Sequence, residues 1–142
     1  MFPAIQRGEV KLLGFPGDEV ATQVGATIVT TKTANERVDT VQRYLRALRK
    51  GARDYHDAFI GPDEKPHKGP TAPEILEIIA KYTGQPAAQI ERALPFIDAE
   101  ARLDVKDVLR QIEWYKGQGM LKGPVDGDAI IDKRYAIALP ER

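Results

Sequence analysis

Two short segments with strand character stand near the start of this chain, and almost everything after them follows a helical pattern. The first spans residues 9–15 and runs into the turn residues 14–18. The second spans residues 23–31 and has the β-branched composition of a buried strand. Two short strands cannot build a sizeable sheet by themselves. The chain is therefore either a helical domain with a hairpin, or a chain whose strands join others that it does not contain.

The most regular pattern is an apolar stripe over residues 38–59. Its members recur every three or four residues: Val38, Val41, Leu45, Leu48, Ala52, Tyr55 and Phe59. This spacing predicts one amphipathic helix of about six turns. We expect Thr33 or Asn35 to cap it, so that the helix covers residues 35–59. Gly51 lies inside it, and its spacing from the stripe suggests a close approach by another element.

A loop and a second helix are expected next. Residues 60–70 contain three prolines and two glycines among charged residues, which is typical of an exposed loop. Thr71 and Glu74 have the spacing of a capping box, in which each side chain satisfies a backbone amide of the first turn. The helix that they open is expected to end at Gly84, because glycine favours the helix C-terminus.

Three shorter helices are expected in the last third of the chain. Pro86 begins the first of these, because proline suits the start of a helix and Pro95 then ends it. Asp104 caps the second, which is expected to end at residues 117–119. The third is expected over residues 128–135. The sequence contains no internal repeat and no low-complexity segment.

Composition excludes several classes of function. Lys and Arg total 21, as do Asp and Glu, so the formal net charge is zero, which argues against a dedicated nucleic-acid binder. The chain has no cysteine, which excludes disulfides, thiolate metal sites and cysteine nucleophiles. It also has no serine, which excludes a serine nucleophile. It also lacks a Gly-rich phosphate loop and any apolar run near the roughly 20 residues that span a bilayer. We therefore predict no enzymatic activity, no cofactor and no membrane span.

The histidines and carboxylates have ordinary structural interpretations. His56 lies off the apolar stripe and His67 lies in the loop, and neither has further ligands at metal-binding spacing, so both are expected to be solvated. Two groups of carboxylates were considered as cation sites: Asp98, Glu100, Asp104 and Asp107, and also Asp126, Asp128 and Asp132. Neither group has the ligand order of a calcium loop, so capping and turn roles are favoured.

The long helix also carries a basic face. Its members are Arg43, Arg46, Arg49, Lys50 and Arg53. Such a face could contact phosphates, but the aromatic residues that would stack on bases are missing and acidic residues share the helix. The simplest interpretation is a solvated face, and the functional alternative is a contact surface for an acidic partner.

An ordered set of short segments extends over nearly the whole chain. They are residues 3–8, 10–14, 23–31, 32–35, 41–47, 72–75, 82–84, 103–105, 111–115, 119–126 and 131–132. In this order the chain resembles the C-terminal part of a substrate-binding protein of ABC importers, of the nitrate/sulfonate/taurine type, a group that includes binders of thiamine precursors. The whole set carries the resemblance, and no single motif does.

The resemblance implies a fold and a domain organisation. The fold would be α/β and helix-rich, namely the C-terminal portion of a two-lobed periplasmic-binding-protein-like fold of class II type. Residues 1–142 would form a single segment. Residues 1–31 would supply two strands of the crossover between the lobes, and residues 32–142 would form a mainly helical region packed on the first lobe. The location would be periplasmic, although the lack of a signal peptide predicts a cytoplasmic location if the chain is complete as given.

The resemblance also implies a function. The chain would be the solute-binding component, or a truncated fragment, of an ABC-type import system for small organic or inorganic anions or thiamine-precursor-like solutes. Its partners would be the solute and an ABC permease, with no nucleic acid. Gln23 and Thr27 are the candidate ligand-binding residues, because the hinge segment borders the cleft in such proteins. The alternative is a small helical interaction domain that uses the basic face of helix 35–59 to bind an acidic partner.

Overall fold

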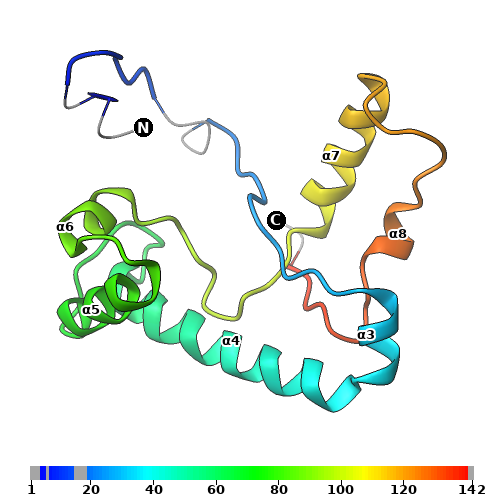
Figure 1. Cartoon of the computed structure of the whole chain (residues 1–142), viewed down its shortest axis with the longest axis horizontal. Coiled ribbons are helices and arrows are strands. Elements are labelled where there is room, and N and C mark those ends of the chain that lie inside the picture. Colours follow the sequence, from blue (N-terminus) through cyan, green and yellow to red (C-terminus); the bar gives the residue numbers. More distant parts are fainter. Residues whose placement is uncertain (1–3, 6, 15–18, 141–142) are drawn as a thin grey trace.

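The computed structural model describes residues 4–5, 7–14 and 19–140, and its described part is helix-rich, as the sequence predicts. Figure 1 shows how the helices are arranged. They are α3 (Thr31–Glu36), α4 (Val38–Phe59), α5 (Ala72–Thr83), α6 (Ala87–Ile90), α7 (Val105–Gly117) and α8 (Gly127–Ile130), and a 3-10 helix η1 (Glu91–Ala93) follows α6. Helix α4 is the longest of these and lies along one side of the molecule (Figure 1).

The C-terminal end of α4 carries the main apolar cluster. Its buried members are Tyr55, Ala58, Phe59, Ala72, Leu76 and Ile90, from α4, α5 and α6. The rings of Tyr55 and Phe59 meet edge to face with centroids 4.9 Å apart. The Tyr55 hydroxyl donates to the carbonyl of Pro95 at 2.7 Å, and burial raises the pKa of Tyr55 to about 12. The predicted stripe is therefore buried at this end of the helix.

The N-terminal end of α4 is held by the last segment of the chain. The Tyr135 hydroxyl donates to the carbonyl of Ala34 in α3 at 2.7 Å, and Arg49 donates to the Tyr135 carbonyl at 3.3 Å. The backbone of Leu103 pairs with residues 137 and 139 through two bonds of 2.8 and 2.9 Å. This end is thus closed by hydrogen bonds over a few buried side chains, namely Ala34, Val41 and Ile131.

The two predicted strands are absent from the described residues. Residues 9–14 are irregular, residues 23–30 form an extended stretch without strand pairing, and Thr31 already begins α3, whereas residue 15 lies outside the described part. The pairing that is described amounts to the isolated bridges Ile60–Pro66 and Leu103–Ala138. A strand exists through its hydrogen bonds to a neighbouring strand, and no described strand or bridge pairs with either segment. The hairpin is therefore wrong for the described residues, and the α/β fold is not established.

The start of the long helix differs from the prediction. Thr30, and not Thr33 or Asn35, acts as an N-cap, because its hydroxyl accepts from the Thr33 amide at 3.1 Å and opens α3. The chain leaves helical geometry at Arg37 (φ −124°), and α4 begins at Val38 without a side-chain cap. The predicted helix 35–59 is thus two helices that meet at a break.

The predicted capping box at Thr71 and Glu74 is also absent. Thr71 has helical backbone angles (φ −88°, ψ −4°) and makes no side-chain cap bond. A capping hydroxyl reaches the first-turn amides from an extended backbone, so Thr71 is wrongly oriented for this role. The end of α5 is as predicted, since Gly84 adopts the left-handed conformation with φ +69°.

The helices after residue 100 follow the prediction more closely. The Asp104 carboxylate accepts from the Asp107 amide at 2.9 Å and caps α7, which ends at Gly117. The last helix, α8, is capped by Asp126 and covers four residues, which is fewer than the predicted 128–135. It ends early because residues 131–139 instead turn back toward α3 and Leu103.

The loop over residues 60–70 is only partly exposed. Its last residues turn back on α4, where the amides of His67 and Gly69 donate to the carbonyls of Phe59 and Ala58 at 2.8 Å. A Cβ at Gly69 would lie 2.4 Å from the carbonyl oxygen of Asp57, so this approach requires glycine. Gly51, by contrast, has nothing within 4 Å of a built Cβ, which makes the expected close approach at Gly51 wrong.

The molecule is open. Its accessible surface is 11052 Å², against about 7,300 Å² for a compact monomer of 15.8 kDa. Leu13, Val24 and Ile28 are 93, 94 and 88% exposed. No helix among the described residues is both long and apolar enough to cross a membrane.

We predict opposite effects for alanine at two glycines. Gly69→Ala should lower the free energy of unfolding by about 1–3 kcal/mol, because the new methyl group meets backbone that cannot move aside. Gly51→Ala, the matched control in the exposed middle of α4, should raise it by about 1 kcal/mol through helix propensity. Urea unfolding followed by circular dichroism measures both changes, and equal effects of the two substitutions would contradict the close approach at Gly69.

Candidate functional site

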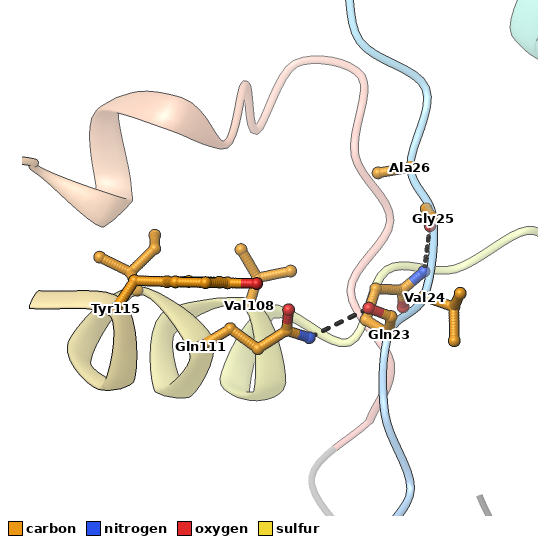
Figure 2. A pocket seen from close by; sticks show the side chains of 8 residues that line it. Gln23, Val24, Gly25, Ala26, Val108, Gln111 and Tyr115 are labelled. Carbon is orange, nitrogen blue, oxygen red and sulfur yellow. Dashed lines mark hydrogen bonds between the residues drawn. The ribbon is translucent and has the colours of Figure 1, made fainter. Parts of the chain in front are cut away.

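The extended segment around Gln23 meets the first two turns of α7, and this junction is the candidate site. Figure 2 shows Gln23, Val24, Gly25 and Ala26 on the extended segment, with Val108, Gln111 and Tyr115 on the adjoining helix. Both backbone polar groups of Gln23 are hydrogen-bonded to side chains of α7. Its amide donates to Asp107 Oδ2 at 2.7 Å, and its carbonyl accepts from Gln111 Nε2 at 3.0 Å.

Asp107 is the centre of this junction. It is 4% exposed, and it accepts hydrogen bonds from Gln23, from Gln111 at 2.7 Å and from Arg110, with which it also forms an ion pair. Burial by itself would raise the pKa of the Asp107 carboxyl, but these donors outweigh burial, and its pKa lies below the ordinary value. The carboxylate is therefore charged at neutral pH and fixes the extended segment to α7.

The Gln23 side chain takes part in the same junction. Its Oε1 accepts from the Asp104 amide at 3.0 Å, and its Nε2 donates to the Gly25 carbonyl at 2.5 Å. The side chain thus occupies the N-terminus of α7 and shapes the turn of its own segment. Gln23 therefore lies at the junction with both ends of its amide engaged within the chain, and its role in ligand binding stays a prediction.

A shallow open groove adjoins the junction. It has a volume of about 230 Å³ and is lined by Gln23, Val24, Gly25, Ala26, Val108, Gln111, Ile112 and Tyr115. Its wall on α7 is mainly apolar, with the Tyr115 hydroxyl and the Gln111 amide as the polar groups (Figure 2). Small-molecule pockets usually hold about 300–1,000 Å³, so this groove could take a small flat solute but could not enclose it.

Thr27 is not brought into the groove. It is exposed, it makes no hydrogen bond within the described part of the chain, and the groove ends one residue earlier, at Ala26. The structure therefore places the two predicted ligand-binding residues differently, with Gln23 in the junction and Thr27 just beyond it. A second hollow, beside α3, is lined by Lys32, Thr33, Glu36 and Arg37 and contains neither of them.

The other sequence candidates are mostly paired within the chain. Burial opposes ionisation of Asp98, but donation from Arg102 and from the Glu100 amide lowers its pKa below the ordinary value. His56 lies edge to face with Phe96 at 6.4 Å. Across the residues that the structure describes, no group of three His, Cys, Asp or Glu side chains could hold a metal ion.

The basic face of α4 is divided by its contacts. Arg53 forms two bonds of 2.6 and 2.7 Å to Glu100, and Arg49 donates to the Tyr135 carbonyl. Arg43 lies 3.7 Å from Asp39, one turn away. Arg46 and Lys50 are exposed and have no ion-pair partner among the described residues. The part of the face that could contact another molecule is therefore the central turn of α4.

Sequence reasoning missed the role of Asp107 and Gln111. The sequence pattern favours a capping or turn role for Asp107 over a cation site, and Gln111 has no predicted role beyond its place in the resembling segment 111–115. The signal in the sequence is their spacing, because residues four apart lie on the same side of a helix. That spacing could not show that Gln23, more than eighty residues earlier, supplies the third member.

Comparison with known proteins gives no further identification: no family model, curated protein or solved structure matches the chain.

We predict that Asp107→Asn unfolds more easily than the native chain. An asparagine turns one acceptor into a donor that faces Gln23, Gln111 or Arg110, so the free energy of unfolding should fall by about 1–3 kcal/mol. Asp104→Asn is the matched control, because asparagine caps a helix as well as aspartate does. Urea unfolding measures both variants, and equal losses would contradict the central role of Asp107.

A comparison of the native chain with Asp107→Asn at different pH values tests the contribution of the Asp107 charge to stability. Since the folded pKa lies below the ordinary value of 3.8, the stabilisation is complete above that value and is lost as the pH falls through the lowered pKa. The difference in stability between the native chain and Asp107→Asn should therefore narrow on acidification below about pH 4. A difference that stays constant down to the acid limit of folding would show that the charge does not contribute.

Proposed function

We propose that the chain is a solute-binding component, or a portion of one, of an ABC-type import system. Its solutes would be small organic or inorganic anions or thiamine-precursor-like molecules, and an ABC permease would be its partner. Its location would be periplasmic. In this proposal the α/β two-lobed fold arises when residues 20–30 pair with strands that the described residues do not supply.

One structural observation carries the proposal most directly. Residues 24–30 are exposed, residues 24–26 line the groove, and the segment ends at a well-defined cap, Thr30. The β-branched composition of this segment fits a place in a half-buried pleated sheet. The resemblance places a strand between two lobes at this position, next to the solute. The residue pattern and the exposed, unpaired edge of residues 24–30 therefore support pairing of this segment with a strand that the described residues do not supply, although Thr31 belongs to α3.

The chemistry of the groove favours one of the solute classes. Arg110, which donates to the Ala21 carbonyl, is engaged by Asp107, and the N-terminus of α7 is already occupied by Asp104 and Gln23. A nitrate or sulfonate group would find no cationic side chain among the lining residues of the groove, and the nearby Asp107 charge would oppose it. A flat, neutral aminopyrimidine could stack on Tyr115 and bond to exposed backbone groups of residues 24–26. The thiamine-precursor-like class is thus the better match.

We predict that the chain binds an aminopyrimidine more tightly than nitrate or taurine, as measured by titration calorimetry. Tyr115→Ala should weaken the affinity by at least about fivefold, because a stacked ring contributes about 1–3 kcal/mol to binding. Tyr82→Ala, which removes an 81% exposed ring from α5, is the matched control and should leave the affinity unchanged.

The same titration tests Thr27. Because Thr27 lies one residue beyond the groove, Thr27→Val should leave the affinity unchanged, as should Thr40→Val. A roughly three- to tenfold loss for Thr27→Val alone would extend the site to this residue. No binding of any of the three solutes to the chain would contradict the proposal. Binding that is unaffected by Tyr115→Ala would move the site away from this groove.

The second candidate function is a helical interaction domain with an acidic partner. The observation that favours it is the pair Arg46 and Lys50, exposed on one face of α4 and without ion-pair partners in the described ranges. It takes second place because Asp39, Asp54 and Asp57 lie on the same helix and reduce the local potential. Such a contact would be electrostatic and would weaken with salt.

If the chain is a helical interaction domain, we predict that its basic face binds an acidic polymer. Polyglutamate should bind the chain at low salt, and the double variant Arg46→Glu/Lys50→Glu should abolish the binding. Arg7→Glu, a charge reversal at an exposed arginine far along the chain from α4, is the control and should change it little. Fluorescence anisotropy at increasing salt measures the effect, and an affinity that does not depend on salt would rule out the basic face.

A further inference from the structure

The stretch from Val20 to Thr31 is unusual for this chain because it carries no charge. Asp, Glu, Lys and Arg make up 30% of the sequence, yet none occurs in these twelve residues, and eight of the twelve are Val, Ile or Thr. There is also no proline among them. Exposed edges are normally protected by lysine, proline or a bulge, and this stretch has none of those residues. It therefore has the composition of a segment that pairs with another strand.

The two edges of the extended segment differ in whether their backbone groups are hydrogen-bonded within the chain. Gln23 directs its amide and its carbonyl to α7, where Asp107 and Gln111 bind them, and the Gly25 carbonyl is taken by the Gln23 side chain. Successive residues of an extended chain direct their polar backbone groups to opposite edges. Residues 24, 26 and 28 therefore direct theirs to the edge away from α7. No hydrogen bond within the described part of the chain satisfies them.

The side-chain pattern and the charge indicate a second copy as the occupant of this edge. Residues at equal distances on either side of Ala26 are alike, with Val24 matching Ile28 and Thr22 matching Thr30, so the edge is complementary to a second copy of itself. The net charge of the chain is zero, so two copies do not repel each other. The segment carries no charged side chain that a different protein could recognise. Pairing of the edge with a second copy of itself requires no charged side chain.

We infer that two copies of this chain pair through residues 22–30 as antiparallel strands about a two-fold axis at Ala26. This register places Val24 of each copy opposite Ile28 of the other, and Thr22 opposite Thr30. It covers the two most exposed apolar side chains of the segment, which are 94 and 88% exposed. β-branched pairs of this kind are the unit that stabilises a sheet. The interface is closed by symmetry and therefore forms a dimer.

The register can be tested with a disulfide, because the chain has no native cysteine. Directly opposed residues of a hydrogen-bonded pair have Cα atoms about 5.5 Å apart, within the range that a disulfide spans. Ala26→Cys should therefore form a covalent dimer under mild oxidation. Leu13→Cys is the control, because Leu13 is equally exposed and lies outside the paired residues. Equal crosslinking of the two variants would overturn the register.

Sedimentation equilibrium of the native 142-residue chain tests the dimer itself. The chain should be dimeric at high micromolar concentration, and Ile28→Lys should raise the dissociation constant about tenfold or more, because two lysines then enter the interface. Leu13→Lys and Ile28→Val should remain dimeric. Circular dichroism of Ile28→Lys should keep the helical signal, since this side chain is almost wholly exposed. A monomer at every concentration, or open-ended fibres in place of a dimer, would overturn the inference.

This inference goes beyond the proposed function and is tested separately from it. The dimer experiments use no solute, and the calorimetric titration compares variants outside residues 24 and 28. A monomer that binds an aminopyrimidine would overturn only the dimer. Because the dimer would cover the backbone groups of residues 24–26, the solute titration is run below the dissociation constant of the dimer, where a chain that binds no solute overturns only the proposed transport function.

Discussion

The structure depends on the length of α4. A helix of 22 residues extends for about 33 Å, which is longer than any cluster that the remaining short helices can build against it. Its two ends are therefore covered by different parts of the chain, with α5 and α6 at the C-terminal end and with α3 and residues 131–139 at the N-terminal end. The middle of the helix is left open, with Leu48 37% and Tyr44 55% exposed. The large accessible surface follows from this division.

The burial pattern of α7 shows how incomplete the packing is. Its apolar face includes Val108, Leu109 and Ile112, and these residues are only half-buried. The most buried residue of the helix is the carboxylate of Asp107. In a helix packed on a core the apolar stripe would be the buried face. The junction with Gln23 is therefore held by directed hydrogen bonds, and the apolar face beside it remains open to another surface.

The sequence predicts the helices well where a local signal sets their ends. Gly84 ends α5 and Asp104 begins α7 because a left-handed glycine and a capping carboxylate act within one turn of the chain. The errors arise where two local signals compete. Thr30 takes the capping role expected of Thr33 or Asn35, and the box at Thr71 is prevented by the backbone angles that the Gly69 turn imposes. Spacing alone could not rank these alternatives.

The candidate site was only half accessible to sequence reasoning, because it joins residues far apart in the chain. Gln23 is a candidate only because the resemblance places its segment at a hinge that borders a cleft, whereas Asp107 and Gln111 gain their role only when the fold brings α7 beside it. The strand prediction for residues 23–31 fails in the described chain for a related reason, since a strand is defined by its neighbour and no local pattern supplies one.

The proposed function and the proposed dimer both follow from the unmet hydrogen bonds at the free edge of residues 24–28. One edge can accept only one strand, so a second lobe and a second copy would compete for the same backbone groups. The Gln23–Asp107 junction acts on the opposite edge and holds the segment extended in either case. It thereby removes part of the entropy cost that either partner would otherwise meet. The buried carboxylate of α7 is thus the residue that prepares this edge for pairing, whichever strand occupies it.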